Sequence, residues 1–220
     1  MTTPQAPETD DLNKLTKALA TLEVDTGGFK DRPNFGWGCP ALNVLDCVLS
    51  LRTNYNRVVL PRIRAFATAC PHVRDLADLQ EQMSRCESPL DFFQRELNFN
   101  SARKSEIVAG VTSYLLTIQK AYDGATEYER LAAWAQSAEP HEAYQVGVHG
   151  FGLAGFQYLR MLFGAQTTKP DMHIRAFVAK IIGRPVTDWE AMTLLDKAAQ
   201  VGGFPLRDVD GAIWKEATQT

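Results

Sequence analysis

The spacing of apolar residues constrains this chain more than any other feature of its sequence. Leu12, Leu15 and Leu19 stand three or four positions apart, and Ile107 and Val111 begin a second series of the same kind. This spacing places side chains on one face of an α-helix. No segment alternates polar and apolar residues over the length that a half-buried strand needs. We therefore predict an all-α fold. The predicted helices span residues 10–24, 41–51, 57–70, 75–85, 88–97, 101–122, 126–137, 140–146, 153–163, 171–182, 187–201 and 206–217.

The 220 residues, 45% of them hydrophobic, suffice for a substantial core. We predict a disordered tail over residues 1–9 and one helical unit over 10–220, with two lobes. One lobe spans 41–135, and the other combines 136–220 with the N-terminal helix. No apolar run is long enough for a membrane span, and no export signal is visible. We therefore expect a cytoplasmic protein, associated with the nucleoid if it is bacterial, and a monomer.

The formal charge of −3 argues at first against a nucleic-acid partner. The charge is uneven, however. Residues 1–31 and 185–220 each carry −3, whereas residues 32–184 carry +3. Two interpretations stay open: a local basic surface within the middle of the chain, or scattered solvated charges.

The segment Val148-His-Gly-Phe-Gly152 lies between two predicted helices. Glycines at 150 and 152 allow positive φ and leave backbone N–H groups facing outward. These groups precede the helix that begins near Leu153, whose dipole also favours an anion. The pattern predicts a phosphate-binding hairpin. The alternative is an ordinary helix–helix turn.

Three segments together carry a family resemblance: the hairpin at 148–152, the run Asp171-Met-His-Ile-Arg175, and Val48-Leu-Ser-Leu-Arg-Thr-Asn54. In this succession the chain resembles the helix-hairpin-helix/Gly-Pro-Asp superfamily of DNA glycosylases, in the endonuclease III-like layout. The resemblance implies a two-lobed all-α fold with the helix-hairpin-helix motif near 140–164. It also implies a role in base-excision repair or modified-base removal.

Asp171 stands at the aspartate position of that superfamily, which implies that it is the catalytic residue. Breaking an N-glycosidic bond passes through an oxocarbenium-like sugar, and a carboxylate can stabilise that charge or activate water. The structural alternative is a helix N-cap, since Pro170-Asp171 opens a predicted helix. Both roles are compatible.

The resemblance also implies contacts to double-stranded DNA that carries a damaged or modified base. Backbone amides of Gly150, Gly152 and Ala154 would hold a phosphate. His149, Lys169 and Arg175 could add contacts or simply be solvated. Arg52 is our candidate for the side chain that fills the gap left by a flipped base, the alternative being an ordinary exposed arginine.

Three aromatic residues are candidates for the base pocket, although such residues more often belong to a core. They are Phe35, Trp37 and Tyr55. The resemblance further implies a monovalent cation, Na⁺ or K⁺, bound by hairpin carbonyls. By motif position these belong to Val146, Val148 and Phe151.

The chain departs from the superfamily at two points. Ala154 replaces the lysine of the bifunctional members, so Schiff-base lyase chemistry there is disfavoured. No cysteine follows Cys86, so no iron–sulfur cluster is expected, and we expect no other cofactor. The sequence thus indicates a monofunctional DNA N-glycosylase. The alternatives are a non-catalytic helix-hairpin-helix DNA-binding protein, an all-α interaction protein, and a lyase that uses another amine such as Lys169.

Overall fold

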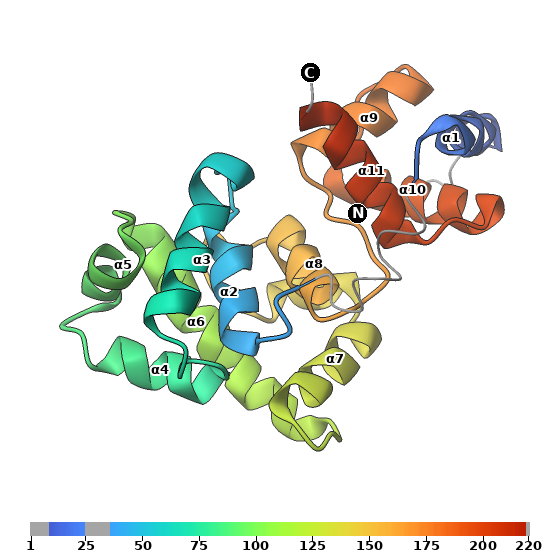
Figure 1. Cartoon of the computed structure of the whole chain (residues 1–220). Helices are drawn as coiled ribbons and strands as arrows, with labels where there is room; N and C mark the ends of the chain where they lie inside the picture. Colours follow the sequence, from blue (N-terminus) through green and yellow to red (C-terminus); the bar gives the residue numbers. More distant parts are fainter. Residues whose placement is uncertain (1–8, 25–35, 219–220) are drawn as a thin grey trace. The chain divides into compact units, whose positions relative to one another are not determined.

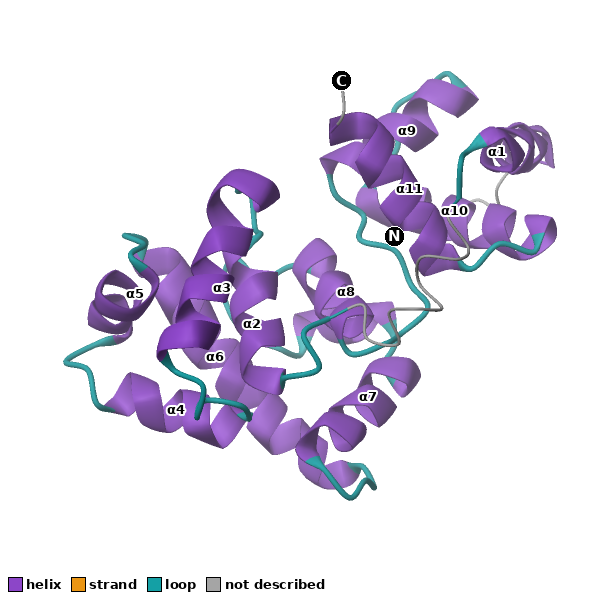
Figure 2. Ribbon diagram, in the orientation of Figure 1, coloured by secondary structure: helices purple, strands orange, loops and turns teal. Residues whose placement is uncertain are grey.

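The computed structural model describes residues 9–24 and 36–218, and this part of the chain is built from helices without a strand (Figure 2). The all-α prediction is therefore confirmed. The α-helices are α1 (Thr9–Thr21), α2 (Pro40–Leu49), α3 (Leu60–Ala69), α4 (Leu76–Ser84), α5 (Pro89–Leu97), α6 (Ala102–Ile118), α7 (Glu127–Ser137), α8 (Leu153–Leu162), α9 (Met172–Ile182), α10 (Asp188–Gly202) and α11 (Leu206–Thr218).

Capping residues set several helix boundaries where the sequence predicts them. The Ser88 hydroxyl accepts the Asp91 N–H at the start of α5. Thr126 and Glu129 form a reciprocal capping box at the start of α7. Each cap satisfies backbone donors that a helix leaves unpaired in its first turn. Local sequence therefore decides where these helices begin.

Two predicted helical segments have a different hydrogen-bond pattern. Tyr55–Val59 forms a π-helical turn, η1, directly before α3, where the sequence predicts a plain helix from residue 57. Pro140–Tyr144 is a 3-10 helix, η3, in place of an α-helix over 140–146. A third short segment, η2 (Gln119–Ala121), is a 3-10 turn that ends α6. Short π-helical turns often occur at functional sites.

The chain divides into two compact units. Unit 2 spans residues 34–165, and unit 1 combines residues from the N-terminal 33 with 166–220. The boundary between the units lies at 165/166, whereas the sequence suggested lobes that meet at 135/136. The reason is α8, which packs against α2, α7 and η3. Its Phe156 and Leu159 are fully buried in the same core as α2.

Unit 2 is arranged around α2, which packs against α3, α4, α6, α7 and α8 (Figure 1). Every residue of Pro40–Leu49 is buried, so this helix is covered on all sides. Trp134 of α7 makes edge-to-face contacts with Phe156 and Phe163, at centroid distances of 5.8 and 6.4 Å. Such pairs add to the stabilisation from burial.

Unit 1 has its own core, formed by α1, α9, α10 and α11. Leu15 and Leu19 of α1 are completely buried against α9 and α10, although about 150 residues separate them in the sequence. The described residues of the N-terminal helix thus complete the C-terminal bundle. None of the described helices combines the length and apolarity that crossing a membrane requires.

Candidate functional site

Two glycines with positive φ shape the turn between η3 and α8, which we call the glycine turn (residues 146–152). Gly147 has φ +68° and Gly150 has φ +89°, both in the region that favours glycine. The Phe151 N–H donates to the Val148 carbonyl at 3.0 Å and closes the turn. The Phe151 side chain is only 4% exposed and anchors the turn in the core of unit 2.

The end of the glycine turn is open to the outside of unit 2. Gly152 is exposed and is the N-cap of α8, and no side chain caps this helix. A Cβ added at Gly152 would meet nothing within 4 Å. The first N–H groups of α8, including that of half-buried Ala154, therefore have no side-chain acceptor at Gly152. A helix start of this kind can bind an anion through its backbone.

Arg103 lies against the glycine turn, a contact that sequence reasoning missed. A Cβ at Gly150 would be 2.6 Å from Arg103 Nε and 2.8 Å from Nη2. Nη2 also lies 3.3 Å from Nε2 of exposed His149. Arg103 belongs to the first turn of α6, 46 residues away from His149 in the sequence. The glycine turn therefore carries a guanidinium from another element on its surface.

Arg52 stands on a second turn, directly after α2. It is exposed and has φ +54°, a left-handed conformation that is uncommon outside glycine. Lys104 holds this turn, since its Nζ donates to the Leu49 carbonyl at 2.6 Å and also to the Thr53 hydroxyl. The ammonium additionally lies 5.2 Å from the ring centroid of Phe99. The left-handed turn is thus fixed to α6.

The first turn of α6 joins these two turns. Arg103 contacts the glycine turn and Lys104 contacts the turn of Arg52. A Cβ on Gly155 of α8 would also meet Leu51 at 3.3 Å. Unit 2 therefore brings together residues that are far apart in the sequence. We call this surface the hairpin face and define it as Arg52, Arg103, His149, Gly150 and Gly152.

The hairpin face is electropositive. Among residues 9–24 and 36–218, no carboxylate lies within 4 Å of the guanidinium of Arg52 or Arg103. Elsewhere on unit 2, Arg85 pairs with Glu81 at 2.6 Å. The first turn of α6 also lacks an acidic residue, although the helix dipole favours one there. Two basic residues in such a turn are the signal by which the sequence could have indicated this surface.

α2, the helix that precedes the turn of Arg52, contains a buried carboxylate. Asp46 of α2 has no exposed surface, and its Oδ2 accepts hydrogen bonds from Trp37 Nε1 at 2.7 Å and Tyr55 Oη at 2.8 Å. Its Oδ1 accepts from Tyr158 Oη at 3.0 Å. Two predicted pocket residues therefore point their polar ends at Asp46, which sequence reasoning missed. The third, Phe35, lies outside the described residues.

The surroundings of Asp46 keep both tyrosines protonated. Burial, followed by the charge of Asp46, raises the pKa of Tyr55 above its usual range. The same two causes raise the pKa of Tyr158 well above 10. Each hydroxyl therefore remains a donor to the carboxylate. Three donors from three segments offset the cost of burying a charge in this core.

Asp171 is the N-cap of α9 in unit 1. Its Oδ1 accepts the N–H groups of His173 and Ile174 at 2.9 and 3.3 Å. Its Oδ2 lies 3.8 Å from Nζ of Lys169, and both side chains are about three-quarters buried or more. Asp171 is therefore a helix N-cap, the structural alternative to a catalytic role. The predicted DNA contact Lys169 faces this carboxylate, and Arg175 pairs with Asp188 at 3.2 Å.

A second carboxylate supports the segment before Asp171. Asp210 of α11 is 8% exposed, and its Oδ2 accepts from the Thr168 hydroxyl at 2.6 Å and the Lys169 N–H at 2.8 Å. Burial raises the pKa of Asp210 to about 6, and the charge of Asp171 adds to the rise. α11 thus turns this carboxylate into unit 1.

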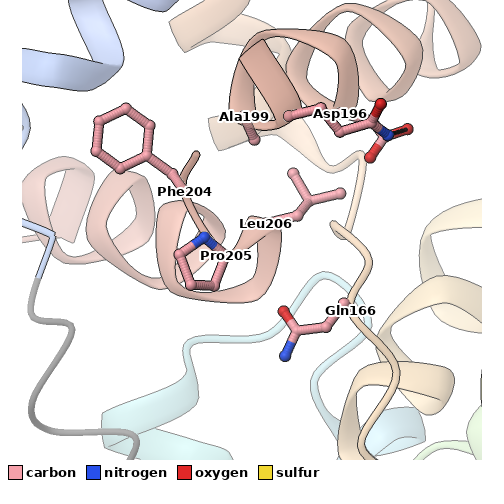
Figure 3. Close-up of a pocket in the computed structure, with 7 residues that line it drawn as sticks. Gln166, Asp196, Ala199, Phe204, Pro205 and Leu206 are labelled. Atoms are coloured by element: carbon pink, nitrogen blue, oxygen red, sulfur yellow. Dashed lines mark hydrogen bonds between the residues drawn. The ribbon is translucent and has the colours of Figure 1, made fainter. Parts of the chain in front are cut away.

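Unit 1 also has a shallow cavity of about 310 Å³ beside α10 and α11 (Figure 3). Its lining is a mixture of apolar and amide side chains around Asp196. None of the predicted site residues lines it. The lining residues are Gln166, Asp196, Ala199, Gln200, Phe204, Pro205 and Leu206.

The described helices make this an all-α protein, and one unit carries a glycine-containing turn and two arginines that have no carboxylate partner among the described residues. The chain belongs to the family described as "Domain of unknown function (DUF8548)", whose model matches residues 7–218. No curated protein and no solved structure matches the chain.

Proposed function

We propose that the protein is a monofunctional DNA glycosylase that removes a damaged or modified base from double-stranded DNA. The observation that carries the proposal is the hairpin face. An open helix start, a glycine turn with φ +89° at Gly150 and two arginines without carboxylate partners lie together on unit 2. Such a set of donors suits the phosphodiester backbone of DNA.

In the proposed reaction, water attacks C1′ of the deoxyribose and the N-glycosidic bond breaks. The water oxygen stays on the sugar, and the base leaves with the bonding electrons and a proton. The Asp171 carboxylate stabilises the positive charge on the sugar or accepts a proton from the water. The two N–H groups that donate to Oδ1 fix the orientation of this carboxylate.

The residue at position 154 supports hydrolysis over lyase chemistry. Ala154 offers no amine to form a Schiff base with C1′. Lys169 is the amine beside Asp171, 3.8 Å from Oδ2. This amine is engaged in an ion pair with Asp171. We therefore propose excision without strand cleavage.

The glycine turn also offers donors for the Na⁺ or K⁺ that we expected. The predicted ligands are the backbone carbonyls of Val146, Val148 and Phe151, and carbonyl oxygens suit hard cations. The Val148 carbonyl accepts one hydrogen bond, from Phe151 N–H, so one lone pair stays available. When bound, such an ion would add positive charge beside a phosphate. No step of the reaction depends on it.

A second candidate function is duplex binding without catalysis. It is favoured by the contacts of Asp171, whose two oxygens already serve an N-cap and an ion pair. These structural contacts are sufficient to explain an aspartate at position 171 without a catalytic role. In that case the hairpin face would bind DNA and unit 1 would have no chemical role.

Excision assays separate the two functions. We expect the wild-type protein to produce alkali-labile abasic sites in at least one duplex of a panel of modified bases. Asp171→Asn should lower this rate by about 100-fold or more, while asparagine still caps α9. Asp75→Asn is the matched control, because Asp75 is the N-cap of α4 in unit 2. Retained excision in Asp171→Asn would show the mechanism to be wrong. Duplex binding without any abasic site would favour the second function.

A further inference from the structure

We propose that Arg103 is a phosphate-binding residue of the hairpin face, where its guanidinium lies directly against Gly150. This inference rests on the proposed DNA partner and extends it to a residue outside the resemblance. It also assigns the first turn of α6 to the DNA-binding surface.

The Arg103 guanidinium lies where the side chain of another residue at 150 would begin, and the φ of +89° at this position favours glycine independently. A Cβ there would be 2.6 Å from Nε, 2.8 Å from Nη2 and 3.1 Å from Cζ of Arg103. Three guanidinium atoms within this range mean that the group lies against the glycine backbone. Gly152, by contrast, has open space around its missing side chain. The two glycines therefore serve different purposes: one admits the arginine and the other leaves the helix start uncovered.

The hydrogen-bond chemistry of the cluster leaves it with donors and little to accept them. The Arg103 guanidinium has only donors, and its contact with His149 Nε2 brings no negative charge. An imidazole therefore cannot balance the charge of Arg103. No carboxylate of the described chain lies within 4 Å of that guanidinium. The cluster retains a full positive charge in a helix turn whose dipole already disfavours it.

Arg103 is carried by a well-fixed part of unit 2. The Ser101 hydroxyl caps α6 by accepting the Lys104 N–H at 3.3 Å. The Lys104 side chain is bound to the Leu49 carbonyl and the Thr53 hydroxyl. The helix turn that carries Arg103 is therefore tied to the turn of Arg52. A group held in this way loses less conformational freedom when it binds a ligand.

The ligand that fits this cluster is a phosphodiester. The guanidinium offers planar, paired N–H donors, which match the oxygens of a phosphate. The open start of α8 lies in the same turn, beside Gly152, and offers backbone N–H groups. A phosphate has enough acceptor oxygens to use both sets together. We infer that one DNA phosphate is bound by Arg103 and the glycine turn.

Duplex binding by fluorescence anisotropy, measured over a series of salt concentrations, tests this inference. Arg103→Ala should weaken binding of an unmodified duplex about fivefold and lower the slope of log affinity against log salt by about one. Arg103→Lys should restore much of the slope but only part of the affinity, because lysine keeps the charge without the paired donors. Arg85→Ala is the matched control, since it removes one exposed helical arginine from unit 2 that pairs with Glu81.

The possible outcomes test the inference and the proposed function separately. Equal affinity and slope in wild type and Arg103→Ala would overturn the inference and leave the glycosylase proposal standing. Equal losses in Arg103→Ala and Arg85→Ala would also overturn it, because they would reflect net charge alone. A wild-type protein that does not bind the duplex would overturn both. Circular dichroism should show all three variants folded, as both arginines are exposed.

Discussion

The backbone of Arg52 adopts a left-handed conformation that costs an ordinary residue about 1 kcal/mol or more. Its φ is +54°, and no hydrogen bond or ion pair joins its guanidinium to another described residue. The side chain therefore does not compensate for the strain within the folded protein. Lys104 maintains the turn instead, through the Leu49 carbonyl. This strain, which brings no structural benefit at the same residue, supports the role proposed for Arg52 in DNA binding.

Substituting Arg52 by glycine separates stability from function. Glycine accepts φ +54° without strain, although it costs more chain entropy on folding. We expect the free energy of unfolding to stay within about 1 kcal/mol of wild type in chemical denaturation. Base excision should fall by at least about tenfold, because the side chain proposed to fill the gap in the duplex is absent. Normal excision by Arg52→Gly would contradict the proposed role, and Arg85→Ala is the control for loss of one charge.

Single residues also show where sequence reasoning ends. Local signals predicted Asp171 as a cap, and the structure confirms the cap. Asp46 gave no such signal, because its partners lie on Trp37 and Tyr55, each nine residues away, and on Tyr158, 112 residues away. Contacts of that kind depend on how helices pack. The clue available in the sequence was a charged residue in Pro40–Leu49, a helix whose other residues are apolar except for Asn43.

At the scale of elements, the order and type of the helices follow from local patterns, whereas their partners do not. Capping residues at 88, 101 and 126 place the starts of α5, α6 and α7. The π-helical turn Tyr55–Val59 was not predictable. The hydroxyl of Tyr55, the first residue of this turn, donates to Asp46 of α2. This tertiary contact occurs together with a π-helical backbone pattern that helix propensity alone does not favour.

The link between α11 and the segment before α9 makes unit 1 sensitive to pH. Asp210 binds the Thr168 hydroxyl and the Lys169 N–H, and Lys169 and Asp171 are the charged groups that face it. Burial raises its pKa from 3.8 to about 6. The folded state therefore holds this proton more tightly than the unfolded state. The resulting stabilisation is complete below about pH 4 and is lost as the pH rises through about 6.

We expect the stability of unit 1 to fall by about 2–3 kcal/mol between pH 4 and pH 7 through Asp210. Hydrogen exchange at the amides of α9 and α11, corrected for the intrinsic effect of pH on exchange, measures it. Asp210→Asn should flatten this dependence, because the asparagine oxygen still accepts both hydrogen bonds and does not titrate. Asp196→Asn, at a half-buried position of α10, should leave this pH dependence in place. An unchanged dependence in Asp210→Asn would assign the effect to another group.

At the scale of the whole molecule, the sequence order of the helices differs from their grouping into cores. α1 shares a core with α9 and α10. Residues 36–165, which lie between these helices in the sequence, form a separate core. Apolar spacing predicts that α1 has a buried face, and we expected α1 to belong to the lobe over 136–220. The boundary between the units lies at 165/166 because the partner of α8 is α2, and only packing reveals this.

The dependence of unit 1 on its N-terminal helix gives a direct test of this grouping. Removal of residues 1–24 takes away Leu15 and Leu19, both fully buried, and the ion pair of Asp11 with Arg184 at 2.9 Å. Burial of each leucine stabilises by about 1.5–3 kcal/mol, so the truncated unit should lose several kcal/mol. Hydrogen exchange at the amides of α9 and α10 should become faster. Exchange at the amides of α2 and α6 measures the core of unit 2 separately.

Two further variants make that test specific. Leu15→Ala in the full chain should destabilise α9 and α10 by about 2–5 kcal/mol, whereas Lys14→Ala, one position earlier and largely exposed, should cost less than about 0.5 kcal/mol. A peptide of residues 1–24 added to the truncated protein should restore protection of α9 and α10 in a concentration-dependent way, since it binds only the folded unit. Full protection of α9 and α10 without α1 would contradict the grouping. It would mean that three helices suffice to bury the apolar faces that α1 covers in the intact chain.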